Sequence, residues 1–303
     1  ENAIAAQAVP GGAGDNSALG NGVDVLLGGG TDHFLPTSLG GKRTDGRDLT
    51  AELKAQGYTY VNSGTAFKAV DTAATTKLVG LFNKSLLNYE LDRAKTANAI
   101  DEPSLADMTE KAIKLLQKND KGFFLMVEGG RIDHALHETT AKKALQDTVA
   151  FDDAIKTAID KMKLKDADLK NTLIVVTADH DHTLVLNGYA ARTGKTTDAN
   201  PGVLGLLKNY VTGALGADVD GNPFTIIGFG NGENRPATRT ALTDAQVAAK
   251  TYHQEAAIPM GVGSETHGGT DVFLGATGRG ADKFTGVINN TEVFNLIRQS
   301  VGL

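Results

Sequence analysis

The chain has 303 residues, no cysteine and a formal net charge of −6 at pH 7. A content of 41% hydrophobic and 22% charged residues excludes a disordered chain, and no apolar run approaches the roughly 18 residues that a membrane span requires. The acidic balance gives no general attraction for nucleic acid, and the lack of cysteine excludes disulfides, thiolate metal sites and cysteine nucleophiles.

The first 122 residues predict strands and a capped helix. The chain begins ENAIAAQAVPGG, with neither an initiator methionine nor a signal-peptide pattern, which predicts an internal start of a longer or processed protein. Apolar runs that end in turn residues predict strands at 23–30 (VDVLLGGG) and 57–63 (GYTYVNS). Ser104 with Asp107 predicts a capped amphipathic helix that runs towards Lys118.

The stretch FFLMVEGGRIDHALH, residues 123–137, sets a dense polar group directly after an apolar run. Five apolar residues predict a strand buried on both faces, and Glu128, Asp133, His134 and His137 follow it. Functional crevices of α/β sheets lie outside the carboxyl ends of strands, so these side chains are candidates for a site. Asp133 and His137 have the i, i+4 spacing of metal ligands on one helix face, although a surface ion pair has the same spacing.

A second helix and the alternation of elements indicate the fold class. An apolar stripe with a period of 3.6 residues runs along this helix. Its members are Leu145, Val149, Ile155, Ile159 and Met162. The alternation of strands with helices predicts an α/β sheet covered by helices on both faces, and we expect one domain over residues 1–303.

The strand predicted at 172–180, TLIVVTADH, also ends in a polar group. Asp179 and His180 are adjacent, so both can bind one ion only if the backbone turns there, and His182 follows two residues later. A capping aspartate beside a partly buried histidine would have the same sequence. Two such strand ends in one chain favour a metal site, which must be built from His, Asp and Glu. Five of the seven histidines fall in these two motifs or in SETHGGTD, which contains His267.

The region 187–222 is rich in Gly, Thr and Asp and predicts a surface insertion. Further strands are predicted at 224–232 (FTIIGFGNG) and 270–278 (TDVFLGATG). The glycines of LLGGG and GFGNG lack the spacing of a nucleotide-binding loop, so we interpret them as turns.

Taken in order, these motifs resemble the alkaline phosphatases, specifically the part downstream of their nucleophilic serine. The resemblance covers nearly the whole chain, and its motifs are VDVLLGGG, LVGLF, KGFFLMVEGGRIDHALH, KKALQDTVAFDDAI, TADHDH, GNG and ETHGGTDV. It implies a three-layer α/β sandwich with a large central, mostly parallel sheet. It also implies hydrolysis of phosphate monoesters through a phosphoserine intermediate.

The resemblance implies two zinc ions per active site. Asp133, His137 and His267 would hold one zinc, and Asp179 and His180 would contribute to the second. Two divalent ions about 3.5–4 Å apart could clamp the attacking and leaving oxygens of a phosphate ester. Because histidine binds metal only when deprotonated, an alkaline optimum is expected.

The resemblance also implies one magnesium ion per active site, with Glu128 as a ligand. An oxygen ligand suits this hard ion. His182 would lie in the outer shell of the metal centre. His134 would lie beside the phosphate, and a solvated helix residue is the alternative for it.

Four functional residues of the family are expected to precede this chain. They are the serine, a further Asp ligand, a Thr magnesium ligand and the phosphate-binding Arg. Residues 15–18, DNSA, resemble the serine motif only superficially, because an Asn is inserted and no helix pattern follows. We therefore expect this chain alone to be inactive and to need a missing N-terminal segment as its partner.

The family further implies a homodimer in the periplasm or outside the cell. Two alternatives to a phosphomonoesterase stay open. One is a metal-binding fragment without turnover, and the other is a superfamily relative that acts on phosphodiesters or sulfates.

Overall fold

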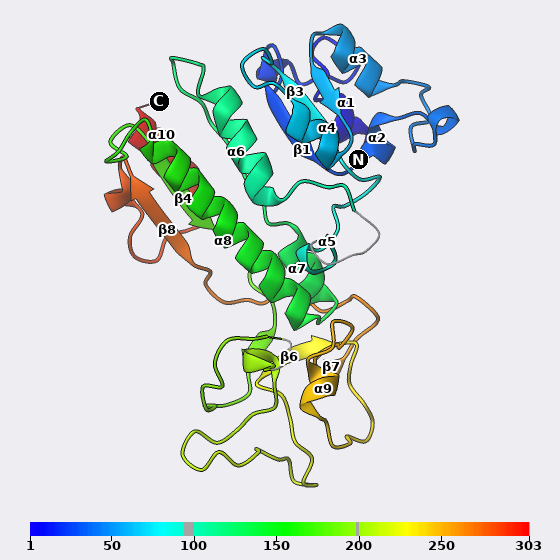
Figure 1. The fold of residues 1–303 in the computed structure, drawn as a ribbon, viewed down its shortest axis with the longest axis vertical. Coiled ribbons are helices and arrows are strands. Elements are labelled where there is room, and N and C mark those ends of the chain that lie inside the picture. Colours follow the sequence, from blue (N-terminus) through cyan, green and yellow to red (C-terminus); the bar gives the residue numbers. More distant parts are fainter. Residues whose placement is uncertain (94–99, 198–199, 303) are drawn as a thin grey trace. The chain divides into compact units, whose positions relative to one another are not determined.

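The computed structural model describes residues 1–93, 100–197 and 200–302 (Figure 1). It comprises two compact units. Unit 1 is Glu1–Gly129 with Ala150–Met162, and unit 2 is Gly130–Val149 with Lys163–Leu303. The single catalytic domain expected over residues 1–303 stays a prediction.

Unit 1 contains a parallel three-stranded sheet in the order β1-β3-β2. Its strands are β1 (Val25–Gly28), β2 (Thr59–Val61) and β3 (Leu78–Leu81), and every residue of the central β3 is buried. Helices α3 (Leu49–Ala55) and α4 (Gly64–Ala69) lie in the sequence between strands, as parallel connections require. The strands predicted at 23–30 and 57–63 are therefore confirmed.

Helix α6 (Leu105–Leu116) begins at the predicted cap. Ser104 Oγ accepts a hydrogen bond from the Asp107 amide at 3.0 Å, and the Asp107 carboxylate accepts one from the Ser104 amide at 3.3 Å. Its buried Met108 and Leu115 pack in one apolar cluster with residues that include Phe67. The shorter helices of unit 1 are α1 (Asn2–Ala6), α2 (Thr31–Phe34) and α5 (Glu90–Arg93), with 3-10 turns at Ser17–Leu19 and Thr37–Leu39.

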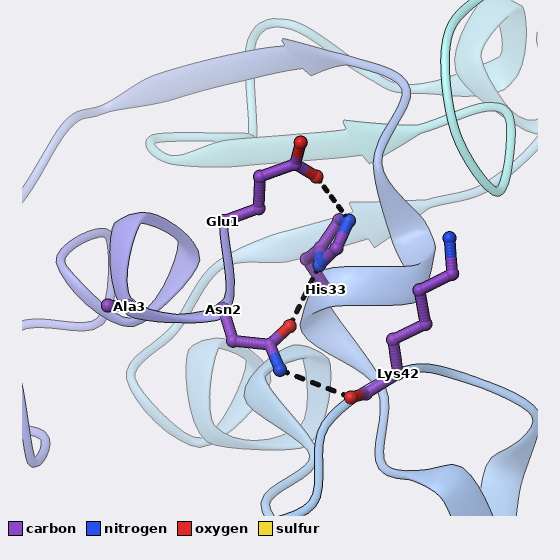
Figure 2. Close-up of a pocket in the computed structure, with 5 residues that line it drawn as sticks. All are labelled: Glu1, Asn2, Ala3, His33 and Lys42. Atoms are coloured by element: carbon purple, nitrogen blue, oxygen red, sulfur yellow. Dashed lines mark hydrogen bonds and ion pairs between the residues drawn. The ribbon is translucent and has the colours of Figure 1, made fainter.

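A pocket of about 520 Å³ lies beside α1 and α2 in unit 1 (Figure 2). Its wall contains His33, which hydrogen-bonds Asn2 Oδ1 through Nδ1 at 2.8 Å and pairs with Glu1 through Nε2. Asn2 also donates to the carbonyl of Lys42 at 3.1 Å. Both ring nitrogens of this histidine are thus engaged in contacts that hold the first helix to α2.

The stretch 123–130 forms no regular element and has no strand partner among the described residues, so the strand predicted there is wrong. Phe124 is 76% exposed and Met126 72% exposed. An apolar run becomes a strand only where neighbours accept its backbone hydrogen bonds and cover its side chains. Local composition indicated the strand, but none of the described strands of unit 1 supplies such a neighbour.

Unit 2 contains an antiparallel pair formed by β4 (Leu173–Thr177) and β8 (Leu274–Gly278). Both strands were predicted, at 172–180 and 270–278. The continuously apolar run of β4 is typical of a strand buried on both faces, but Leu173 to Val176 are only half-buried. In the described chain β4 has a strand partner on one edge only, so it does not have the position of a central strand in a larger sheet.

A second sheet of unit 2 has the order β5-β6-β7. Its strands are β5 (Leu184–Leu186), β6 (Ile227–Gly232) and β7 (Ala256–Pro259), and β6 pairs antiparallel with β5 and parallel with β7. Ile227 and Phe229 of β6 are buried in a common cluster with other apolar side chains. The strand predicted at 224–232 is confirmed.

The predicted insertion at 187–222 follows β5. In its described residues it has a 3-10 turn at Gly202–Leu204 and isolated bridges such as Ala190 with Asn209. The remaining helices of unit 2 are α7 (Arg131–His137), α9 (Asp244–Val247) and α10 (Glu292–Val301), with a 3-10 turn at Ala281–Lys283.

Helix α8 (Ala141–Lys163) contains the predicted apolar stripe and contributes residues to both units. Parallel strands with intervening helices confirm the α/β class, and the described strands form three sheets. Within the described chain, no helix has the length and apolar character needed to cross a membrane.

Candidate metal centre

Helix α7 directs Asp133 and His137 from one face. The two residues are one helical turn apart, so their side chains project in nearly the same direction. Asp133 Oδ1 lies 3.4 Å from His137 Nε2. The other ring nitrogen of His137, Nδ1, donates to the backbone carbonyl of Glu265 at 2.5 Å, which turns Nε2 towards Asp133.

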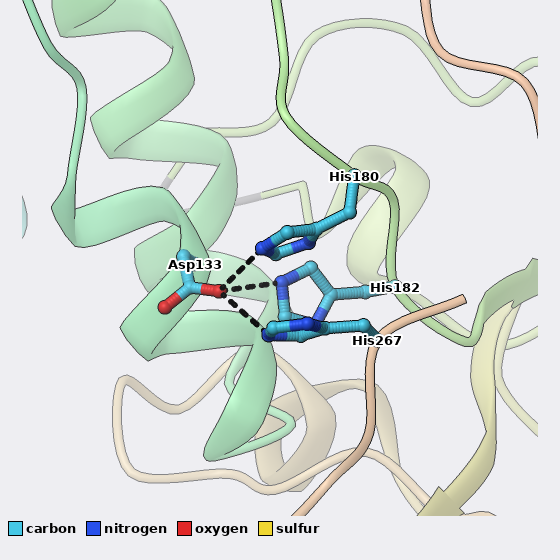
Figure 3. A group of neighbouring side chains, drawn as sticks. All are labelled: Asp133, His180, His182 and His267. Atoms are coloured by element: carbon cyan, nitrogen blue, oxygen red, sulfur yellow. Dashed lines mark hydrogen bonds and ion pairs between the residues drawn. The ribbon is translucent and has the colours of Figure 1, made fainter. Parts of the chain in front are cut away.

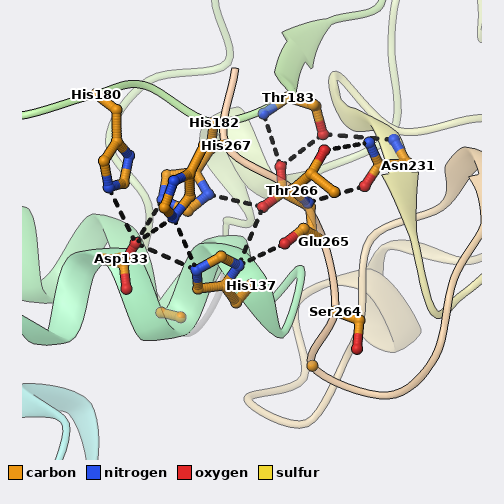
Figure 4. Close-up of polar contacts among 12 residues, drawn as sticks. Asp133, His137, His180, His182, Thr183, Asn231, Ser264, Glu265, Thr266 and His267 are labelled. Carbon is orange, nitrogen blue, oxygen red and sulfur yellow. Dashed lines mark hydrogen bonds and ion pairs between the residues drawn. The ribbon is translucent and has the colours of Figure 1, made fainter. Parts of the chain in front are cut away.

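His267 reaches the same point from a loop far along the chain (Figure 4). An isolated antiparallel bridge pairs His182 with His267 and brings the two loops together. His267 Nε2 lies 3.2 Å from His137 Nε2 and 3.6 Å from Asp133 Oδ1. Three ligand atoms from two segments thus form a compact triangle.

The dimensions of this triangle fit one tetrahedral zinc ion. Two nitrogens that each lie 2.0–2.1 Å from one zinc are about 3.3 Å apart in tetrahedral geometry. The triangle formed by Asp133, His137 and His267 has sides of 3.2, 3.4 and 3.6 Å. Two imidazole nitrogens and one carboxylate oxygen are also donors that zinc prefers, and three protein ligands leave a fourth position open.

The loop after β4 carries Asp179 and His180. The His180 ring stacks on that of His267, with centroids 3.5 Å apart, and His180 Nε2 lies 3.8 Å from Asp133 Oδ1 (Figure 3). Asp179 Oδ2 lies 3.4 Å from His180 Nε2, although the Asp179 side chain is 85% exposed. His180 therefore joins the cluster, while Asp179 contacts His180 and stays largely exposed.

Hydrogen bonds between two loops hold this arrangement. The Thr270 hydroxyl donates to the Asp181 carboxylate, and the Gly268 amide donates to the Asp181 carbonyl at 2.9 Å. The hydrogen bond from Thr270 lowers the pKa of the Asp181 carboxyl. Asp181 thereby ties the TADHDH loop to the loop that carries His267.

The end of β6 fixes the His267 loop from the other side. Asn231 accepts from the Thr266 amide at 2.9 Å, and its amide group donates to the Thr266 hydroxyl at 2.8 Å. The neighbouring Gly232 packs closely, since a Cβ there would lie 2.5 Å from Thr139 Cγ2. The GNG motif, interpreted from sequence as a turn, thus forms the end of β6 and supports a loop of the metal centre.

His182 and Glu265 form a buried pair next to the triangle. His182 Nδ1 lies 2.7 Å from Glu265 Oε2, and His182 Nε2 lies 3.0 Å from Asp133 Oδ1 (Figure 4). The His182 side chain is 4% exposed and that of Glu265 is fully buried. Sequence reasoning missed Glu265, although it stands two residues before His267 within ETHGG.

Two groups of potential ligand atoms overlap at His182. One consists of Asp133, His180, His182 and His267, and the other of His137, His182 and Glu265. Within each group the atoms lie within 4.8 Å of one another.

Besides Asp179, two residues expected from sequence are not part of these groups. His134 projects from α7 and donates from Nδ1 to the Gly130 carbonyl at 2.8 Å. Glu128 is exposed and belongs to unit 1. The roles of both residues stay predictions.

Comparison with known proteins gives matches along the whole chain. The family model described as alkaline phosphatase matches residues 2–303. A membrane-bound alkaline phosphatase of Bombyx mori is 35% identical over 293 residues, which are 91% of this chain and 49% of that protein. The tissue-nonspecific isozyme of Rattus norvegicus is 36% identical over 284 residues, 88% of this chain and 50% of that protein. The chain spans about half the length of these curated relatives.

A solved structure has a similar fold. It is a mutant of the TAB5 alkaline phosphatase with Mg bound in its M3 site, and it is 25% identical with a TM-score of 0.56. The similarity covers 93% of this chain and 61% of that one. The α/β fold predicted from the sequence is therefore of the type found in alkaline phosphatases.

Proposed function

This chain belongs to the alkaline phosphatase family, and from that premise we propose that it carries the metal-binding part of a phosphomonoester hydrolase. The observation that carries the proposal is the triangle of Asp133 Oδ1, His137 Nε2 and His267 Nε2, with sides of 3.2–3.6 Å. A structural ion pair would need only one histidine beside the carboxylate. The convergence of two histidine nitrogens on it therefore favours a bound metal ion.

We assign two zinc ions and one magnesium ion to the complete site. Asp133, His137 and His267 would hold the first zinc, with one position open. His180 Nε2 and Asp179 Oδ2, which lie 3.4 Å apart, would contribute to the second. Glu128 would be a magnesium ligand, and the magnesium in the related TAB5 mutant structure supports the presence of this ion in the family.

Bound divalent ions would supply electrostatic stabilisation of the attacking and leaving oxygens of a phosphate ester. The residues of this chain would hold the ions and orient the ligand side chains. The Glu265 carbonyl accepts a hydrogen bond from His137 Nδ1, so the Nε2 lone pair of His137 faces the site. His134, whose Nδ1 is engaged by the Gly130 carbonyl, has Nε2 left for a water-mediated contact with phosphate.

We further propose that the reaction passes through a phosphoserine, and that this serine lies outside residues 1–303. The setting of Ser17 in the DNSA segment supports this assignment, because it does not suit a nucleophile. Ser17 begins an exposed 3-10 turn of unit 1 that Asn16 caps, whereas a nucleophile needs rigid neighbours to position it. The phosphate-binding arginine is assigned to the same outside segment. The complete enzyme would be a secreted or periplasmic homodimer.

The test compares the 303-residue chain with the same chain supplied with the upstream segment of its parent protein. We expect zinc retention and turnover of p-nitrophenyl phosphate with the segment, and weaker zinc binding without turnover above background in the chain alone. Zinc per chain is measured by mass spectrometry of the metal after desalting.

Three outcomes would contradict the proposal. The supplemented protein could retain no zinc, or it could prefer bis(p-nitrophenyl) phosphate or an aryl sulfate to the monoester. The chain alone could turn over the monoester at an ordinary enzymatic rate, which would overturn the assignment of the serine to an outside segment.

A further inference from the structure

We propose that Glu265 is a positioning residue of the metal centre, and that its carboxylate holds the His182 ring so that Nε2 faces Asp133. The inference rests on the proposed function, since it concerns the same centre. It assigns a role to a buried residue that is not part of the triangle of Asp133, His137 and His267.

The contacts of the Glu265 carboxylate fix each of its oxygens. Oε1 accepts from the Thr183 amide at 2.7 Å and from the Thr183 hydroxyl at 2.6 Å. Oε2 lies 2.7 Å from His182 Nδ1. A fully buried carboxylate with a defined partner on each oxygen cannot rotate without losing hydrogen bonds that no water replaces.

These contacts determine what each nitrogen of His182 does. A carboxylate only accepts hydrogen bonds, so the nitrogen beside Oε2 must be Nδ1–H. Nε2 faces a second carboxylate oxygen, Asp133 Oδ1, 3.0 Å away, and without a metal ion it donates a hydrogen bond to that oxygen. A carboxylate that accepts from one nitrogen of a histidine and so fixes the orientation of the ring is a common outer support of metal centres.

The backbone of the same residue orients a second ring. The Glu265 amide donates to the His137 carbonyl at 3.2 Å, and the Glu265 carbonyl accepts from His137 Nδ1 at 2.5 Å. Glu265 therefore holds His182 through its side chain and His137 through its main chain, and its Oε2 also lies 3.7 Å from His137 Nδ1. A side-chain substitution removes the contacts of the carboxylate and leaves the two main-chain hydrogen bonds with His137.

Substitution Glu265→Gln tests the role of the carboxylate. The Thr183 amide is a permanent donor, so the oxygen of the new amide must stay beside it, and the NH₂ group then faces His182 Nδ1. A donor at that place requires an Nδ1 lone pair, so Nδ1 loses its hydrogen while Nε2 keeps the one that it donates to Asp133. Glu265→Gln should therefore remove the Nδ1 hydrogen of His182, while the hydrogen bond from His137 to the main chain of residue 265 stays.

The primary measurement is long-range ¹H–¹⁵N NMR of the histidine rings in the full 303-residue chain without metal. We expect a protonated Nδ1 at His182 in the native chain and an unprotonated Nδ1 in Glu265→Gln. The second measurement is zinc affinity by competition with a chelator. It should fall about 10- to 100-fold in Glu265→Gln and in Glu265→Ala, as for outer partners of metal ligands.

The control is Glu233→Gln. Glu233 is another carboxylate of unit 2 beside a histidine, with Oε1 2.7 Å from His253 Nδ1, and neither residue belongs to the metal-ligand groups. This variant should leave the Nδ1 hydrogen of His182 and the zinc affinity unchanged.

Two results would overturn the inference. His182 could keep its Nδ1 hydrogen in Glu265→Gln, or added zinc could bind the native chain through the Glu265 carboxylate, which would make Glu265 a direct ligand. If the chain binds no zinc at all, the proposed function fails, while the NMR measurement still decides the role of Glu265.

Discussion

Two polar clusters of unit 2 differ in the groups that face their carboxylates. In the Arg239 cluster, the guanidinium of Arg239 donates to Glu255 at 2.8 and 2.6 Å, to the Pro223 carbonyl at 3.0 Å and to Asp218. In the metal centre, Asp133 Oδ1 faces histidine Nε2 atoms at distances of 3.0 to 3.8 Å. The first cluster contains a permanent cation, whereas the second contains imidazole nitrogens that can bind a metal ion.

The difference explains why one cluster is structural and the other is a site. The hydrogen bond to Glu255 raises the pKa of Arg239, so this charge is present at every pH at which the protein folds. The cluster ties the insertion, through Asp218, to Glu255 beside β7 and needs no further ion. The metal centre instead has His137 Nε2 and His267 Nε2 3.2 Å apart, an arrangement that a bound cation stabilises.

The largest effect is expected from breaking the metal centre. Substitution His267→Ala removes one of three zinc ligands, so zinc affinity should fall by more than the about 100-fold that loss of an outer partner causes. Chelator competition on the full chain measures it. His253→Ala, a histidine outside the metal-ligand groups, is the control and should retain native affinity. Equal zinc affinity in His267→Ala and the native chain would remove this residue from the site.

The location of this centre could be predicted in part because its signals are local. The i, i+4 pair of α7 and the polar residues after β4 can be recognised in short stretches. Glu265 could not be assigned, because its role depends on the fold bringing it to Thr183 and His182, 82 and 83 residues away. Its motif marks the residue as a candidate, but only the fold identifies its partners.

The same contrast separates the correct and incorrect elements of the fold. Helix α6 was predicted well because the capping box and the apolar face are both local. The stretch 123–130 was predicted as a strand, and it is not one, because strand formation depends on partners elsewhere in the chain. The apolar exposure of Phe124 and Met126 is the physical consequence of that missing pairing.

A smaller effect is expected from breaking the Arg239 cluster. Substitution Arg239→Met leaves Asp218 and Glu255 without their shared cation, so the protein should lose stability. Because all three side chains are partly exposed, solvent screening limits the loss, and we expect the Tm to fall by about 2–4 °C. Differential scanning calorimetry measures the shift.

Zinc affinity provides the control for Arg239→Met. It should equal that of the native chain, since the Arg239 cluster does not share a residue with the metal centre. A simultaneous loss of zinc binding would mean that the two clusters are coupled, and the distinction drawn between them would fail.

The smallest effect is expected on lowering the pH, because the two clusters should lose their interactions at different pH values. The hydrogen bond from the Asn222 amide, 2.8 Å long, and the Arg239 guanidinium lower the pKa of Asp218. A carboxyl whose pKa is lower in the folded state stabilises the protein above its unfolded pKa of about 3.9. That contribution disappears as the pH falls through the lower folded value.

Substitution Asp218→Asn should therefore lower the urea midpoint slightly at neutral pH, and its difference from the native chain should vanish in strong acid. The metal centre should respond earlier in the same titration, because histidine must be deprotonated to bind zinc and protons displace the ion. Zinc release, followed with a chromogenic chelator, is thus expected at a higher pH than the loss of the Asp218 contribution.

If the native chain and Asp218→Asn still differed at a pH well below the folded pKa of Asp218, a contact other than the carboxylate charge would stabilise the insertion. Release of zinc only in that same acidic range would show that carboxylates rather than histidines hold it.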